Sequence, residues 1–382
     1  MNKKEIAEIK KQFTQENCAI TRICSCYVNG EKEIISNTKD AFLSLPEEDE
    51  FKYFDIFKHT LSGTIGKNLI NMDFPLEQEK EGGTQHFLWQ LRESELKDDD
   101  LVNQMYQRII GSYDHVGNYY IILIFAAYDI PGRAKDGSEM FDTSEHVYNH
   151  ILCSICPVAL TKPGLGYNHE TGRIENRIRD WVVQPPATGF LFPAFNDRDA
   201  DIHSLLYYTK NPEQLQPGFI DEIVGTAQPL SAGNQKETFN TIITDTLGED
   251  CGYEVVRTIH ETLNEMIEET KEEPEPLTLS KNEVKNLFEQ SGVPNERIQI
   301  FEKEFADIAG DEHTTFIASN IANVRKFNIE TPDVVIKVNP ERSDLVETRE
   351  IDGRQCLIIP IDDHIEVNGV SVHTFTKGQK DN

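Results

Sequence analysis

The run YYIILIFAAY at residues 119–128 constrains the fold of this chain more than any other segment. It carries no charge, and apolar side chains occupy its odd and even positions alike. This pattern is typical of a strand that is buried on both faces, because a half-exposed strand alternates polar and apolar residues. The run is far shorter than the roughly 20 apolar residues that cross a bilayer. We therefore expect residues 119–129 to form a central strand.

Helical and strand-like patterns alternate irregularly along the rest of the chain, which predicts an α+β fold. The expected strands are 19–28, 188–195 and 202–209, followed near the end by short strands at 334–338, 345–351 and 356–361. Helical periodicity marks residues 1–13, 48–61, 84–96, 99–110, 236–247, 253–270, 280–291 and 295–309.

These segments predict three regions. Residues 1–230 form a mixed sheet domain with helices, residues 231–310 a helical middle segment, and residues 311–382 a small β-rich region. Within the middle segment, residues 268–276 (EETKEEPEP) are acidic and contain two prolines, which indicates a linker. Asp352-Gly353 and Asn368-Gly369 are hairpin signals, so the last region is expected to be an antiparallel β meander.

The charge balance limits the partners that the chain can have. Its 66 acidic and 37 basic residues give a net charge of -29, which repels nucleic-acid phosphates unless a local basic patch overrides the field. Seven cysteines are an odd number and form no disulfide framework. The first residues are charged and helical rather than an apolar signal region. We expect a cytoplasmic protein that does not span a membrane.

The residues that look most like a metal site are His146, His150, Cys153 and Cys156. On a helix, the first three would share one face, and histidine and cysteine are ligands that zinc prefers. The alternative, which we favour, is a buried strand at 151–160, which would place the two cysteines on opposite faces.

A second candidate for a divalent metal is the group Asp199, Asp201 and His203. Asp197, Asp199 and Asp201 alternate as at the opening of a calcium loop, but counted from Asp197 the sixth position is Ile202 and the twelfth is Tyr208, where glycine and glutamate are required. A solvated hairpin turn is the alternative that we favour.

Arg173, Arg177 and Arg179 form a small basic cluster, and Arg173 and Arg177 would share a face if this segment were helical. They could bind an anionic partner. Acidic residues alternate with them, at positions 170, 175 and 180, so local ion pairing is the alternative.

Four stretches of sequence resemble one family over nearly the whole chain: 21–26 (TRICSC), 81–85 (EGGTQ), 189–198 with 202–208, and 327–334 (FNIETPDV). That family is bacterial and is described only as a domain of unknown function, so the resemblance implies no activity. The order of segments is also faintly similar to that of nucleoid-associated proteins, and similarity of layout alone fixes no function.

From these patterns we hypothesise a non-catalytic protein that binds a macromolecule, most readily another protein, and that needs no cofactor. Edge strands of the C-terminal β region could serve as its docking edge. One alternative is a metal-dependent hydrolase in which zinc or another divalent ion activates water at one of the two candidate sites. Another is a nucleoid- or ribosome-associated factor that contacts nucleic acid through a local patch or an intermediary.

Overall fold

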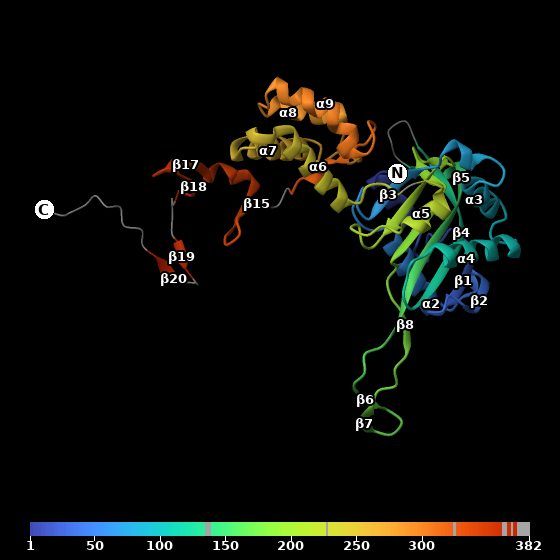
Figure 1. Ribbon diagram of the computed structural model, residues 1–382. Coiled ribbons are helices and arrows are strands. Elements are labelled where there is room, and N and C mark those ends of the chain that lie inside the picture. The colour runs from blue at the N-terminus through green and yellow to red at the C-terminus, as the bar shows by residue number, and fades with distance from the viewer. Residues whose placement is uncertain (134–138, 227, 324–325, 361–364, 368–369, 373–382) are drawn as a thin grey trace. The chain divides into compact units, whose positions relative to one another are not determined.

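The computed structural model describes residues 1–382 except 134–138, 227, 324–325, 361–364, 368–369 and 373–382 (Figure 1). It divides into two compact units. The first comprises Met1–Gln235 with Glu273–Pro276, and the second Lys236–Glu272 with Leu277–Asn382. Helices and antiparallel strands in both confirm the α+β class. In the part of the chain described, no helix has the length and apolar character needed to span a membrane.

The first unit is built on one antiparallel sheet with the spatial order β2-β1-β4-β5-β9-β12-β3, and β8 pairs with β5 beside this path. Its strands are β1 (Ile20–Val28), β2 (Ile34–Ala41), β3 (Leu69–Asp73), β4 (Asn118–Arg133), β5 (Glu139–Leu160), β8 (Trp181–Val183), β9 (Thr188–Phe192) and β12 (Ser204–Thr209). The strand expected at 119–129 is therefore the interior strand β4.

Helices cover both faces of this sheet, which explains the continuous apolar run of β4. Ile122 and Ile124 pack in a core with α1 (Lys3–Lys10) and α2 (Glu47–Thr60). Ile121 and Leu123 pack in a second core with three other helices. These are α3 (Thr84–Glu93), α4 (Asp99–Ser112) and α5 (Pro217–Val224). Because successive side chains of a strand point to opposite faces, a strand between two helical layers must be apolar throughout.

A small hairpin, β10 (Ala194–Asn196) with β11 (Asp199–Asp201), follows β9. Asp197 and Arg198 form its turn with φ of 52° and 61°, in the left-handed region. The strand expected at 188–195 is thus divided between β9 and β10, since the Pro193 nitrogen has no hydrogen to donate to a ladder.

The second unit contains the helical segment and the C-terminal strands. Its helices are α7 (Tyr253–Glu269), α8 (Lys281–Gln290), α9 (Asn295–Ala309) and α10 (Ala318–Ile321), with most of α6 (Ala232–Leu247). The described strands pair two by two: β13 (Thr278–Leu279) with β14 (Phe316–Ile317), β15 (Phe327–Glu330) with β16 (Val335–Val338), β17 (Glu347–Ile351) with β18 (Arg354–Ile358), and β19 (Ile365–Val367) with β20 (Val370–Val372). The described strands of the C-terminal region therefore form separate antiparallel pairs, and the predicted Asn368-Gly369 turn lies outside the described residues.

The acidic segment at 268–276 is partly helical and partly a piece of the first unit. Helix α7 continues to Glu269, and Glu273–Pro276 belongs to the unit that holds α1. The Lys3 amide donates a hydrogen bond to the Pro274 carbonyl oxygen at 3.4 Å.

Candidate interaction arm

A two-stranded ribbon projects from the sheet of the first unit (Figure 1). We call residues 161–183 the arm. At its tip, β6 (Leu165–Asn168) pairs with β7 (Arg173–Asn176). Between the tip and the sheet, two backbone hydrogen bonds of 2.9 Å join the two strands of the arm, from the Thr161 amide to the Asp180 carbonyl and from the Arg177 amide to the Gly164 carbonyl.

Prolines separate the base of the arm from strand β9. Pro185 and Pro186 have no amide hydrogens, so they bulge out of the ladder with β5. On either side, the Gln184 amide donates to the Pro157 carbonyl and the Ala187 amide to the Ile155 carbonyl, both at 2.8 Å. The pairing with β5 therefore resumes beyond the bulge, and the arm is a continuation of the sheet.

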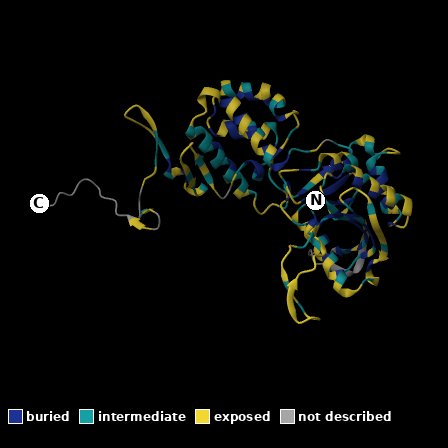
Figure 2. Cartoon of the chain, turned by 60° about the horizontal axis from the view of Figure 1, so that its bottom comes forward, coloured by how far each residue is buried: buried dark blue, intermediate teal, exposed yellow. Residues whose placement is uncertain are grey.

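One face of the arm tip is apolar and lies in solvent. Tyr167 lies opposite Ile174 in the ladder, so the two side chains share a face of the ribbon. Leu165, two residues before Tyr167 on the same strand, points to that face as well. Their exposed fractions are 56 %, 65 % and 76 %. Ile178 and Trp181, nearer the base, are also exposed. Figure 2 shows the ribbon of the arm largely in the colour of exposed residues. Such a group of large apolar side chains on a surface indicates an interaction site.

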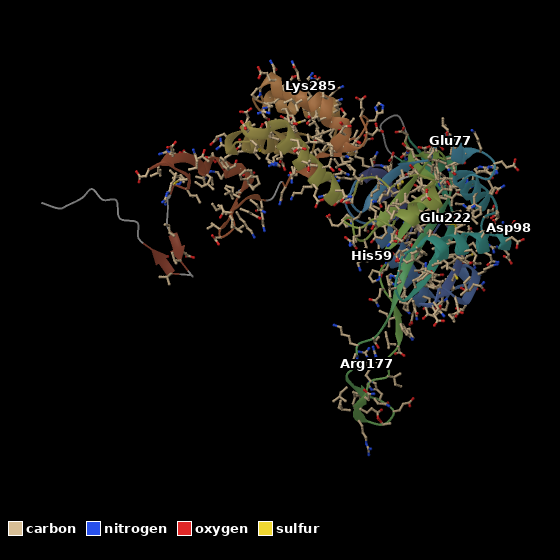
Figure 3. The ribbon with its side chains drawn as sticks, viewed as in Figure 1. His59, Glu77, Asp98, Arg177, Glu222 and Lys285 are labelled. Atoms are coloured by element: carbon tan, nitrogen blue, oxygen red, sulfur yellow. The ribbon has the colours of Figure 1, made fainter. Side chains whose placement is uncertain are left out.

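The other face of the tip carries the two predicted arginines. Arg173 and Arg177 lie on β7 and its continuation, not on a helix, and strand alternation places them on one face with Glu175. The Glu175 carboxylate accepts hydrogen bonds from Asn168 Nδ2 and, at 3.3 Å, from Thr171 Oγ1. Both arginines are exposed, and Figure 3 shows Arg177 on the arm, away from the sheet.

The four residues of the predicted His/Cys group lie on strand β5 and not on a helix. His146 is exposed, whereas His150 is fully buried. Cys153 packs in the core under α3, α4 and α5, and Cys156 packs in the opposite core. Three residues along a strand reverse the direction of a side chain, so the structure does not bring these four side chains to one point. Burial raises the pKa of both thiols, that of Cys156 to about 12.

Burial also lowers the pKa of His150 to about 4, although a weak hydrogen bond with the Tyr148 carbonyl opposes the shift. The ring stacks on Tyr148, with 4.5 Å between the centroids. The unfolded chain takes up a proton at this histidine near pH 6.5, and the folded chain does so only near pH 4. Stability is therefore lost as the pH falls through this window.

We expect His150→Gln to reduce the loss of unfolding free energy between pH 8 and pH 5 by on the order of 2 kcal/mol. Urea titrations at the two pH values would measure it. His146→Gln is the matched control on the exposed part of the same strand. An unchanged pH dependence in His150→Gln would contradict the expectation.

In the acidic candidate site (Asp199, Asp201 and His203), the Asp201 carboxylate is occupied by hydrogen bonds from nearby residues. The Asp201 carboxylate accepts hydrogen bonds from Asn196 Nδ2 and Ser204 Oγ, both at 2.7 Å, and from the His203 amide at 3.0 Å. Burial alone would raise the pKa of Asp201, but these bonds outweigh it and lower the pKa. Asp199 is exposed.

His203 turns toward another acid. Its Nδ1 lies 2.7 Å from Glu79 Oε1, and this hydrogen bond raises the His203 pKa. Among the residues that the structure describes, no three histidine, cysteine, aspartate or glutamate side chains come close enough to hold a metal ion together.

The fold and the arm define an α+β protein whose first unit presents an amphipathic ribbon to solvent. The chain belongs to the family described as Domain of unknown function (DUF4317), whose model matches residues 1–370. The resemblance inferred from the four stretches of sequence is thereby confirmed. No curated protein and no solved structure matches the chain, so the similarity of layout to nucleoid-associated proteins gains no support.

The sequence pattern missed the arm as an element. Leu165 and Tyr167 are two residues apart, as on a strand, and Gly172 is a residue typical of turns. These were the available signals for a hairpin. The spacing of Arg173 and Arg177, four residues, fits a helix as well as a strand, so it does not identify β7.

Proposed function

We propose that this protein is a non-catalytic binding protein whose arm holds an acidic protein partner. The observation that carries the proposal is the apolar face formed by Leu165, Tyr167 and Ile174 in solvent. An isolated two-stranded ribbon is marginally stable in water, so contact with a partner would stabilise it. Burial of each such side chain is worth about 1.5–3 kcal/mol.

The composition of the arm favours a protein over a nucleic acid. Tyrosine, tryptophan and arginine are the residues that dominate binding energy at protein interfaces, and the arm contains Tyr167, Trp181 and three arginines. The arm offers few cations to nucleic-acid phosphates, and the net charge of -29 on the whole chain would repel them.

The charge of the arm favours an acidic partner. Residues 161–183 carry four basic and three acidic side chains, whereas acids greatly exceed bases in the chain as a whole. Arg173 and Arg177 on the polar face would pair with carboxylates at the rim of an apolar groove. We also propose a cytoplasmic location, since all seven cysteines are unpaired thiols.

The test compares two arm variants with the wild type and one control. Leu160 pairs directly with Trp181, so residues 161–180 can be replaced by Asn-Gly, which closes a two-residue hairpin without altering the sheet. Tyr167→Ser combined with Ile174→Ser removes the apolar face alone. Val116→Ser, at a fully exposed apolar position elsewhere, is the control.

Each tagged protein would be cross-linked in cells of its source, and the partner would be purified and titrated against it. We expect an acidic protein that binds the wild type and the control equally, binds both arm variants at least about tenfold more weakly, and is released by salt. Equal affinity for the shortened variant would overturn the proposal. So would the absence of any arm-dependent protein, capture of nucleic acid instead, or dependence on the hairpins of residues 311–382.

A further inference from the structure

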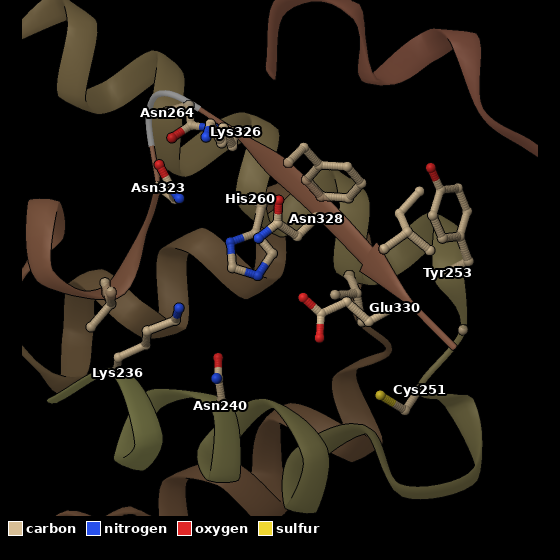
Figure 4. Close-up of a pocket in the computed structure, with 15 residues that line it drawn as sticks. Lys236, Asn240, Cys251, Tyr253, His260, Asn264, Asn323, Lys326, Asn328 and Glu330 are labelled. Atoms are coloured by element: carbon tan, nitrogen blue, oxygen red, sulfur yellow. The ribbon is translucent and has the colours of Figure 1, made fainter. Parts of the chain in front are cut away.

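The second unit contains a pocket of about 420 Å³ between α6, α7 and β15 (Figure 4). This volume lies in the range of sites for small molecules, roughly 300–1,000 Å³. The pocket does not involve the arm or any residue proposed above as a metal ligand. Its polar lining consists of Lys236, Asn240, Asn264, Asn323, Lys326 and Asn328, with His260, Tyr253, Cys251 and Glu330.

Two lysines and one carboxylate line this pocket, in a chain in which acids outnumber bases. Lys236 is on α6, and Lys326 immediately precedes β15. Burial lowers the pKa of His260, and the Lys236 ammonium adds to the effect, so both favour the neutral imidazole. The excess of positive charge favours an anionic ligand, and lysine binds phosphate as a point charge.

The amides of Asn240, Asn264 and Asn328 line the pocket and carry both donors and acceptors. Oδ1 of Asn264 is buried and accepts no hydrogen bond from the described residues. A buried acceptor without a donor costs free energy that a ligand N–H group would recover. An asparagine amide also matches the donor and acceptor edge of a nucleobase, as it does when it pairs with adenine.

Aromatic rings form one wall of the pocket. The Phe327 ring centroid lies 6.4 Å from that of Tyr253 and 6.4 Å from that of His260. Lys326 and Asn264 lie toward one end of the pocket in Figure 4, and Tyr253 and Cys251 toward the other. Lys236 lies apart from Lys326, beside Asn240, but both lysines are on the side of the pocket away from Tyr253 and Cys251. The site therefore offers cations on one side and a ring for stacking, which suits an elongated ligand.

We propose that this pocket binds a nucleoside monophosphate. The phosphate contacts Lys236 and Lys326, the base lies along the Phe327 wall, and asparagine amides bind the edge of the base. The three features are needed together, since phosphate alone would not use the rings and a nucleoside alone would not use the lysines.

Isothermal titration of the full chain with AMP, GMP, CMP and UMP tests the proposal, with adenosine and inorganic phosphate as partial ligands. We expect saturable binding of at least one monophosphate, and binding of its nucleoside and of phosphate at least about tenfold weaker. Lys236→Gln and Lys326→Gln should each weaken the binding several-fold. Lys303→Gln, an exposed lysine on α9 outside the pocket, should not.

Three results would overturn the proposal: no heat of binding with any of the four monophosphates, phosphate binding as tightly as the nucleotide, or equal affinity in Lys236→Gln and Lys303→Gln. Lys236 and Lys326 are exposed, so we expect both variants to keep the fold, and circular dichroism would verify that they do. None of these results depends on the arm, and the Asn-Gly variant of the arm should bind the nucleotide as the wild type does.

Discussion

Gly189→Ala is expected to lower the free energy of unfolding of the first unit by about 3 kcal/mol. Gly189 lies in β9, opposite Ser154 of β5. A Cβ at this position would lie 2.2 Å from the Cys153 carbonyl oxygen and 2.8 Å from Thr60 Cγ2. The first of these atoms belongs to the backbone of the neighbouring strand and cannot move without breaking the ladder.

The close approach at Gly189 is what lets α2 reach the sheet. Thr60, the last residue of α2, is fully buried, and its hydroxyl lies 2.6 Å from Ser154 Oγ. An alanine methyl would push this helix end outward as well as the strand. The expected cost therefore includes lost packing of α2 in addition to the backbone clash.

Gly111→Ala is the matched control, because a Cβ there meets no atom within 4 Å. Gly111 lies within α4, where alanine is the better helix former, so this variant should gain roughly 0.5 kcal/mol. The two tryptophans, Trp89 and Trp181, both belong to the first unit, so urea unfolding followed by tryptophan fluorescence measures this unit. Equal stability of the two variants would contradict the clash.

Glu8→Ala is expected to destabilise the first unit by about 3 kcal/mol. Glu8 of α1 forms an ion pair with Arg198 in the turn of the β10–β11 hairpin, at 3.0 Å from Oε1 to Nη2. Arg198 Nε adds a bond of 3.1 Å to the same oxygen, and the Tyr128 hydroxyl donates to it at 3.0 Å. The side chains of Glu8 and Arg198 are only 15 % and 12 % exposed, so water screens the pair weakly.

Removal of the carboxylate would take the Glu8 counter-charge and its hydrogen bonds away from the Arg198 guanidinium. Glu16→Ala, at an exposed position just after α1, controls for the loss of a negative charge. The double variant Glu8→Leu with Arg198→Met should be more stable than Glu8→Ala, because it removes both charges. If Glu8→Ala unfolds at the same urea concentration as Glu16→Ala, the pair does not anchor α1.

Both predictions concern contacts between residues far apart in the chain, and these were beyond the reach of pattern analysis. Glu8 and Arg198 are separated by 190 positions. Nothing in either local sequence distinguishes this pair from other acids and arginines on a charged surface.

Among the candidate sites, too, local spacing predicted some features, and others depend on contacts between distant segments. Alternation along a strand predicted correctly that Cys153 and Cys156 face opposite sides. The pairing of Arg173 and Arg177 on one face was expected on a helix and is formed on a strand, because a spacing of four places residues together in both geometries. The pocket in the second unit draws its lining from residues 236 to 330, whose proximity no spacing rule reveals.

By itself the sequence determined the α+β class, the buried strand β4 and most of the helices, because each depends on the periodicity of a contiguous stretch. The order of strands in the sheet, the projection of the arm and the cluster of lysines, amides and rings in the second unit were decided by the tertiary structure. They depend on which distant segments pack together, and that choice minimises the free energy of the whole unit rather than of any one segment.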